Sequence, residues 1–196
     1  WSENGFVETI QVIFILCSLL VTIYSIKKSK IKIEKRILLI ISLGLFYYLG
    51  EEISWGQHYL NFNTPVILES LNNQKEFNLH NISNLFDQLP RSLVLLFCCF
   101  NFLFILMNNK FFKIKSQYLI FILPNKNLVF ISILLLLISM PDLLNEKLNL
   151  NLISHVGNYM YEIITLNYIR LSELQELIFS FYFLNYSLAL KYNLKI

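Results

Sequence analysis

Residues 6–26 read FVETIQVIFILCSLLVTIYSI, and Glu8 is the only charged side chain among them. An α-helix needs about 20 mostly apolar residues to cross the hydrocarbon core of a bilayer, so this stretch predicts a transmembrane helix. Acidic residues precede the stretch and lysines follow it, which is the reverse of a signal peptide. Because the stretch is long, apolar and near one end of the chain, it indicates a membrane protein built from helices.

Four more stretches repeat this pattern further along the chain. Together with 6–26, the stretches 37–57, 92–108, 127–144 and 173–190 predict an all-α, polytopic membrane helix bundle with five spans in one domain. The composition agrees, since 56% of the 196 residues are hydrophobic, 15% are charged and the mean hydropathy is +0.54. A soluble domain carries about 25% charged residues. The formal charge of +3 is too small to indicate a nucleic acid partner.

The basic residues are concentrated in alternate connections between the predicted spans. Twelve of the 16 lysines and arginines lie in 27–36, 109–126 and 191–196, and Glu34 is the only acid on that side. Short loops rich in lysine and arginine stay in the cytoplasm, so we expect the N-terminal end outside and the C-terminal end inside. The other acids and all three histidines then face outward. Acidic residues contribute little to orientation, so topology does not explain why they gather on the outer side. We therefore expect any function at this outer side.

The outer connection between the second and third spans, 61–90, is predicted to cap the bundle. Thr64 followed by Pro65 is typical of a helix start, with a capping hydroxyl and then proline at the first helical position. The helix that follows, roughly 65–77, has one apolar face. We therefore expect an amphipathic helix lying on the membrane surface.

The segment 50–58, GEEISWGQH, is the most informative part of the chain for chemistry. If the helix of the second span continues through it, Glu51, Ser54, Trp55 and His58 share one face, and Gln57 adjoins them. A glutamate inside the bilayer costs several kcal/mol, so this face would contact protein or water rather than lipid. The alternative is that the two glutamates lie at the interface and end the helix.

Other polar residues are expected near the same outer level, from four of the five spans or their adjoining loops. Arg91 is expected to pair with these acids, with phosphate binding as the alternative. The full set of this predicted pocket comprises Glu8, Glu51, Glu52, Ser54, Trp55, Gln57, His58, Glu76, Asn78, His80, Arg91, Glu173 and Glu176.

Clustered carboxylates and imidazoles suit a divalent metal ion, which is the one cofactor this set indicates. Glu52, Glu76 and His80 are the candidate ligands, and Glu76 and His80 would be one turn apart on a helix. The Glu-x-x-His pairs of di-iron bundles are absent from the sequence. A mononuclear zinc site using His58, His80 or His155 stays open. So does a metal-free pair of glutamates acting as acid and base or as a proton relay.

Two motifs in this region resemble those of a family of uncharacterised bacterial inner-membrane proteins. They are EEISWGQ at 51–57 and NQKEFNLHN at 73–81, which, with Asn72 as the first residue of the second motif, match the patterns E-E-x-S-W-G-Q and N-x-Q-x-E-x-N-L-H-N. The resemblance implies a bacterial inner-membrane protein and no known activity. Two positions depart from it: His58 stands where arginine is expected, and Val66 where glutamate is expected. Arginine is no metal ligand, so His58 ranks below the other site candidates.

Three functions follow from these observations. The first is a membrane enzyme acting on a lipid or lipid-linked substrate, with Glu51 or Glu52 as general base or metal ligand and His80 as partner. The second is a non-catalytic subunit or assembly factor for a membrane-protein partner, whose motif holds 61–90 onto the bundle. The third is a proton-coupled transporter titrating Glu51 or Glu52, although the sequence has no internal repeat and no sign of a broken mid-membrane helix.

Overall fold

The computed structural model describes residues 5–60, 62–65, 77–79, 82, 84–108, 121–122, 128–148 and 171–194. Helices and turns make up these residues, with no strand among them, so the predicted all-α fold is confirmed. The long helices are α1 (Phe6–Lys28), α2 (Lys32–Glu52), α5 (Asn84–Asn108), α7 (Val129–Leu148) and α9 (Leu171–Tyr192). A 3-10 turn, η1 (Ser54–Gly56), and the short helix α3 (Gln57–Leu60) follow α2.

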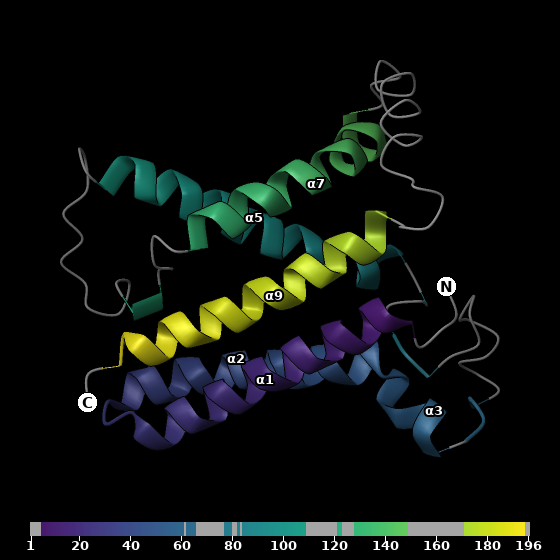
Figure 1. The fold of residues 1–196 in the computed structure, drawn as a ribbon, viewed down its shortest axis with the longest axis horizontal. Helices are drawn as coiled ribbons and strands as arrows, with labels where there is room; N and C mark the ends of the chain where they lie inside the picture. The colour runs from purple at the N-terminus through teal and green to yellow at the C-terminus, as the bar shows by residue number, and fades with distance from the viewer. Residues whose placement is uncertain are drawn as a thin grey trace.

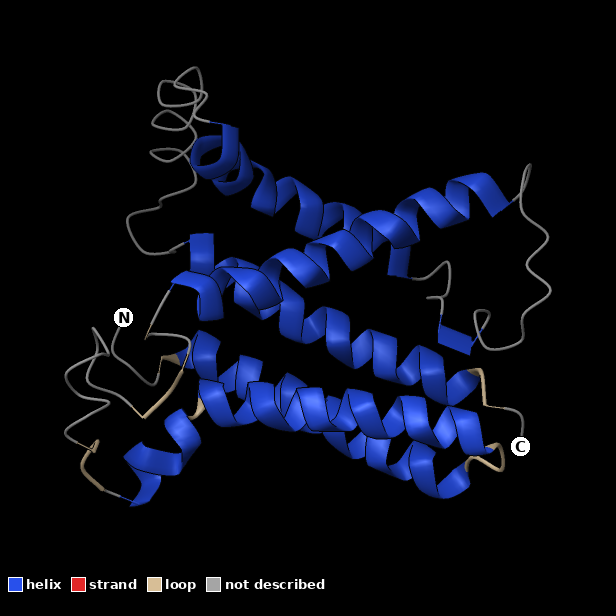
Figure 2. Ribbon diagram, turned by 180° about the vertical axis from the view of Figure 1, so that it is seen from behind, coloured by secondary structure: helices blue, strands red, loops and turns tan. Residues whose placement is uncertain are grey.

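The five long helices form two groups. α1 packs against α2 and α9, while α5 packs against α7, and α7 joins the groups by packing against α9. Figures 1 and 2 show the α1–α2 turn beside the C-terminal end of α9 at one end of the bundle. The start of α1, the start of α9 and α3 lie at the opposite end. We call these the basic end and the motif end, after the residues that each carries.

Apolar side chains form two cores between the helices. A small one joins α1 and α2 through Ile15, Leu19 and Leu45. The larger one draws on α2, α5, α7 and α9, with residues such as Leu38, Cys98, Leu135, Tyr182 and Leu190. The bundle is thus held by packing along its whole length.

The polarity of α1 is reversed relative to a helix of a soluble protein. Its exposed face carries Leu16, Leu20 and Ile23, whose side chains are 40–57% exposed. The residues that it buries include polar ones: Gln11, Ser18, Thr22 and Ser25. Soluble helices bury their apolar stripe, whereas helices packed in lipid place small polar residues at their contacts.

Hydroxyl groups join α1 to α9. The Ser18 and Ser187 hydroxyl oxygens are 2.6 Å apart, and the Ser18 hydroxyl also lies 3.0 Å from the carbonyl oxygen of Phe183, which it can donate to. Thr22 Oγ1 is 3.2 Å from Ser187 Oγ and 2.8 Å from the carbonyl oxygen of Ser18. These contacts satisfy hydroxyls that would otherwise be buried without partners, and they fix how the first and last described helices pack.

Among the described residues, α1 is the one helix that is long and apolar enough to cross a bilayer, judged by length and composition. Only 28% of its apolar window is buried within the structure, so α1 is not a buried core helix. Leu89–Phe100 of α5 and Val129–Ser139 of α7 are shorter apolar segments. Each of the five predicted stretches lies largely within one long helix, but five spans across a membrane remain a prediction.

The prediction that the second helix runs through residue 57 is wrong. α2 ends at Glu52, and the backbone then turns at Ser54, Trp55 and Gly56, which all have positive φ (46°, 51° and 84°). A right-handed helix cannot continue through such residues. The helical face predicted for 51–58 therefore does not exist. Contacts among the side chains of these residues do not come from helical spacing.

Candidate functional site

At the motif end, the Glu51 carboxylate accepts two hydrogen bonds from different parts of the chain. Trp55 Nε1 donates to Glu51 Oε1 at 2.8 Å, and the Leu79 backbone N–H donates to Glu51 Oε2 at 2.7 Å. Glu51 is 4% exposed. Hydrogen bonds to a buried carboxylate are among the stronger ones in proteins. Glu51 therefore fastens the segment 77–79 to the end of α2.

The next part of the motif holds the same segment. The Phe77 backbone N–H donates to Gln57 Oε1 at 2.6 Å, while Gln57 Nε2 donates to Thr64 Oγ1 at 2.8 Å. Asn78 and Ser54 are both buried, with Asn78 Nδ2 lying 3.4 Å from Ser54 Oγ. We call these contacts, with the two to Glu51, the 51–79 network. This network joins the predicted motif 51–57 to residues 77–79, the described part of the predicted motif 73–81.

The backbone after α2 explains how Trp55 reaches Glu51. Left-handed φ values at Ser54 and Trp55 turn the backbone away from the axis of α2 within two residues. The indole then lies against Gly50, where an added Cβ would be 2.9 Å from ring atoms of Trp55. Phe46 and Tyr47 contact the same indole edge-on, with ring centres 6.0 and 6.1 Å away. Position 50 therefore needs glycine because a tryptophan occupies the space of its side chain.

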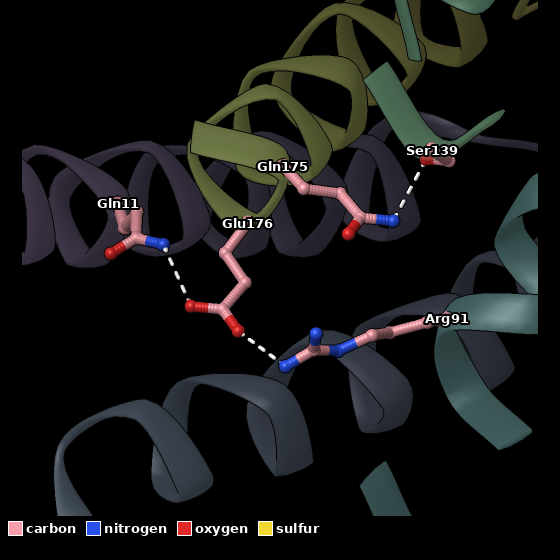
Figure 3. Close-up of polar contacts among 5 residues, drawn as sticks. All are labelled: Gln11, Arg91, Ser139, Gln175 and Glu176. Atoms are coloured by element: carbon pink, nitrogen blue, oxygen red, sulfur yellow. Dashed lines mark hydrogen bonds and ion pairs between the residues drawn. The ribbon is translucent and has the colours of Figure 1, made fainter. Parts of the chain in front are cut away.

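A second set of polar contacts at the motif end joins four helices (Figure 3). Arg91 of α5 forms an ion pair with Glu176 of α9, with Nη2 and Oε1 2.5 Å apart. Gln11 of α1 extends Nε2 toward Glu176 Oε2 at 3.5 Å, a long contact. Gln175, the residue before Glu176, makes a separate contact: its Nε2 donates to Ser139 Oγ of α7 at 2.8 Å. The start of α9 is thus tied to α1, α5 and α7.

Tyr48 and Glu52 of α2 complete this cluster. The Tyr48 hydroxyl is hydrogen-bonded to Glu52 and lies within electrostatic range of Glu176 and Arg91. Gln11 is fully buried, and its Oε1 has no hydrogen-bond partner among the described residues. We call Gln11, Tyr48, Glu52, Arg91 and Glu176 the Arg91 cluster. In this cluster Arg91 pairs with Glu176, and Tyr48 bonds to Glu52.

The expected pairing of Arg91 with an acid is confirmed by its contact with Glu176. Glu8 Oε2 accepts a hydrogen bond from the Gly5 backbone N–H at 3.1 Å and so caps the start of α1; its predicted place in the polar pocket stays a prediction. Glu173 lies in the first turn of α9, where its negative charge interacts favourably with the positive end of the helix dipole. The acids at the motif end therefore have several separate structural roles.

Three predicted site residues cannot be placed. Glu76 and His80 lie outside the described residues, as does the side chain of His58. Phe77, Asn78 and Leu79, which separate Glu76 from His80, are not helical, so the helical spacing used to pair those two residues is wrong. Most of the predicted amphipathic helix 65–77 and all of His155 also fall outside the described ranges.

Within the described ranges, no group of three or more His, Cys, Asp or Glu side chains lies close enough to hold a metal ion. Glu52 is the one candidate ligand that is described. The divalent metal stays a prediction, because its other proposed ligands, Glu76 and His80, lie outside those ranges.

Sequence reasoning missed Tyr48, Thr64 as the partner of Gln57, and the glycine requirement at Gly50. Tyr48 carries a weak signal, since it lies one helical turn before Glu52 on a predicted helix. The Thr64 contact and the glycine requirement at Gly50 depend on the backbone turn after α2, which the spacing of residues in the sequence does not reveal.

Comparison with known proteins finds no family model, no curated protein and no solved structure that matches this chain.

Proposed function

We propose that the chain is a polytopic bacterial inner-membrane protein of five spans, with its motif end outside and its basic end in the cytoplasm. The reversed polarity of α1 supports the membrane, because exposed leucine and isoleucine side chains suit lipid and buried hydroxyls suit helix contacts. Exposed apolar residues on the other long helices, such as Leu43, Leu96, Phe130 and Leu188, extend this surface. The lysines of the α1–α2 turn support the orientation.

We further propose a non-catalytic role, as a membrane subunit or assembly factor for a membrane-protein partner. One observation carries this role: both oxygens of the Glu51 carboxylate accept hydrogen bonds that hold the outer segment 77–79. A general base or metal ligand needs an oxygen facing the substrate or ion. Glu51 instead serves to build a fixed outer surface at the motif end, where a partner can dock.

Topology is tested with fusions to the C-terminal end of the full chain. A cytoplasmic C-terminal end makes a green fluorescent protein fusion fluoresce and leaves an alkaline phosphatase fusion inactive. Active phosphatase would contradict the orientation, and a chain released from membranes by alkaline carbonate would contradict the membrane proposal.

The role is tested in cells that depend on this chain, with Glu51→Gln and Glu52→Gln as a matched pair. A structural role predicts that Glu51→Gln lowers the amount of folded protein in the membrane and that the cellular defect follows that amount. Glu52→Gln should leave both unchanged. A Glu51→Gln protein with normal abundance and stability but no cellular activity would contradict the structural role.

A membrane enzyme acting on a lipid or lipid-linked substrate is the second candidate, and the Arg91 cluster favours it. Glu52 is only partly buried and is not among the contacts that define the 51–79 network; it bonds to Tyr48, which Arg91 influences electrostatically. A carboxylate next to a phenol and a guanidinium can serve as a general base near a phosphate-bearing substrate. Loss of cellular activity in a Glu52→Gln protein that folds normally would favour this candidate. The described residues contain nothing that favours the transporter over these two.

A further inference from the structure

The basic end of the bundle carries a dense group of positive side chains. The turn from α1 into α2 contributes Lys27, Lys28, Lys30, Lys32, Lys35 and Arg36, and α9 contributes Lys191; all seven are exposed. Figures 1 and 2 show that the turn and the C-terminal end of α9 lie side by side. Positive charge from two distant parts of the sequence therefore meets on one surface.

The only acid of this turn is withdrawn from that surface. Glu34 is 5% exposed, and its Oε2 accepts a hydrogen bond from the Ser29 hydroxyl at 2.8 Å. Ser29 is itself buried. Because Glu34 is buried and hydrogen-bonded to a hydroxyl, the charged side chains that residues 27–36 expose are all positive.

Two of the lysines converge on one aromatic ring. The Lys28 and Lys191 ammonium groups lie 5.7 and 5.1 Å from the centre of the Tyr24 ring. Each is within range of a cation–π contact, so two like charges from α1 and α9 lie within about 6 Å of the centre of one ring. An anion that contacts both ammonium groups would relieve their repulsion. The helix ends oppose an anion with about half a negative charge each, but two full positive charges outweigh this.

We infer that Tyr24, Lys28 and Lys191 bind the phosphate of an anionic phospholipid headgroup in the cytoplasmic leaflet. This inference rests on the membrane placement in the proposed function. Phosphate chemistry follows from the paired ammonium groups. A lipid is favoured over a soluble phosphate because exposed apolar side chains of α1, Leu20 and Ile23, lie within the turn just before Tyr24 and offer a surface for acyl chains.

The test uses the full chain in nanodiscs of phosphatidylglycerol mixed with phosphatidylcholine, and native mass spectrometry counts the phosphatidylglycerol that stays bound on release. The double variant Lys28→Gln with Lys191→Gln should bind phosphatidylglycerol about 100-fold more weakly, because each of the two lost ammonium–phosphate hydrogen bonds is worth roughly tenfold in affinity. The control Lys30→Gln with Lys32→Gln removes the same charge from exposed positions for which no contact with Tyr24 is described. It should retain most of the binding.

Several outcomes would overturn the inference. Equal losses in both double variants would mean that binding depends only on the summed charge. Unchanged binding in the Lys28 and Lys191 variant would remove these residues from the site. Inorganic phosphate that displaces the lipid at equal concentration would mean a soluble anion is the ligand. Normal insertion without phosphatidylglycerol preference contradicts this inference alone, whereas failure to insert contradicts the proposed function.

A charge-preserving variant guards against misfolding as the cause. Lys28→Arg with Lys191→Arg keeps both positive charges and should restore phosphatidylglycerol binding to within a few-fold of the parent chain. Failure of this variant to bind, with a normal melting temperature, would also count against the assignment.

Discussion

The Glu51→Gln substitution tests the 51–79 network at its centre. Glu51 receives two donors, the Trp55 indole and the Leu79 amide, one at each oxygen. Glutamine offers one acceptor oxygen and one NH₂ group, so one donor must face another donor. Leaving a buried donor unsatisfied costs about 1–3 kcal/mol. For a chain of this size, that corresponds to a melting temperature lower by roughly 2–12 °C.

Hydrogen exchange at the Leu79 amide measures the same loss locally. Each 1.4 kcal/mol is tenfold in an equilibrium, so the expected acceleration of exchange is about 5–150-fold. Glu52→Gln is the matched control, because it changes the neighbouring carboxylate and should leave the Leu79 amide protected. Trp55→Phe is a second control: it removes one donor to Glu51 Oε1 but leaves the contact from Leu79 to Oε2.

The refuting result is equally specific. If Glu51→Gln leaves Leu79 exchange and the melting temperature unchanged in purified protein, the carboxylate does not hold segment 77–79. If Glu52→Gln releases Leu79 as strongly as Glu51→Gln does, the effect is a loss of charge at the motif end and not of two defined hydrogen bonds.

Two further substitutions test contacts described above. Gly50→Ala places a Cβ 2.9 Å from Trp55 ring atoms, and such overpacking costs about 1–3 kcal/mol; thermal unfolding should show a lower melting temperature. Gly44→Ala has open space at its Cβ and should be neutral or stabilising by up to about 1 kcal/mol, so equal effects at both glycines would contradict the Trp55 contact. Ser187→Ala removes the partner of Ser18 and Thr22 and should cost about 0.6–2 kcal/mol. The Ser42 hydroxyl donates to the Leu39 carbonyl oxygen of its own helix, so Ser42→Ala should destabilise the protein less. An equal cost for the two substitutions would count against the α1–α9 hydroxyl contacts.

The helices were predictable from hydropathy because long apolar runs between charged turns have few other solutions. The backbone turn at Ser54 and Trp55 was not predictable. Positive φ is uncommon for residues with a side chain, and helical spacing continued without interruption through the same positions. Glu51 and Trp55 were expected to share a face and do meet, but through a turn rather than through a helix.

Pairings between distant helices were only partly predictable. The sequence indicated that Arg91 would find an acid, since a lone arginine at a membrane boundary near several carboxylates needs a partner. It did not indicate Glu176, because the choice depends on how α5 and α9 pack. Gln175 and Ser139 likewise meet only in the assembled bundle.

The contact between α1 and α9 bears on how the chain is made. Ser18 and Ser187 are 169 positions apart, so α1 leaves the ribosome long before the helix that satisfies its polar face. In the proposed membrane placement, Gln11 and the α1 hydroxyls must be shielded from lipid by another protein or by neighbouring α2 until α9 emerges. The polar face of α1 is therefore completed only when α9 has been made, and in that placement a truncation before α9 should yield a product that membrane quality control degrades.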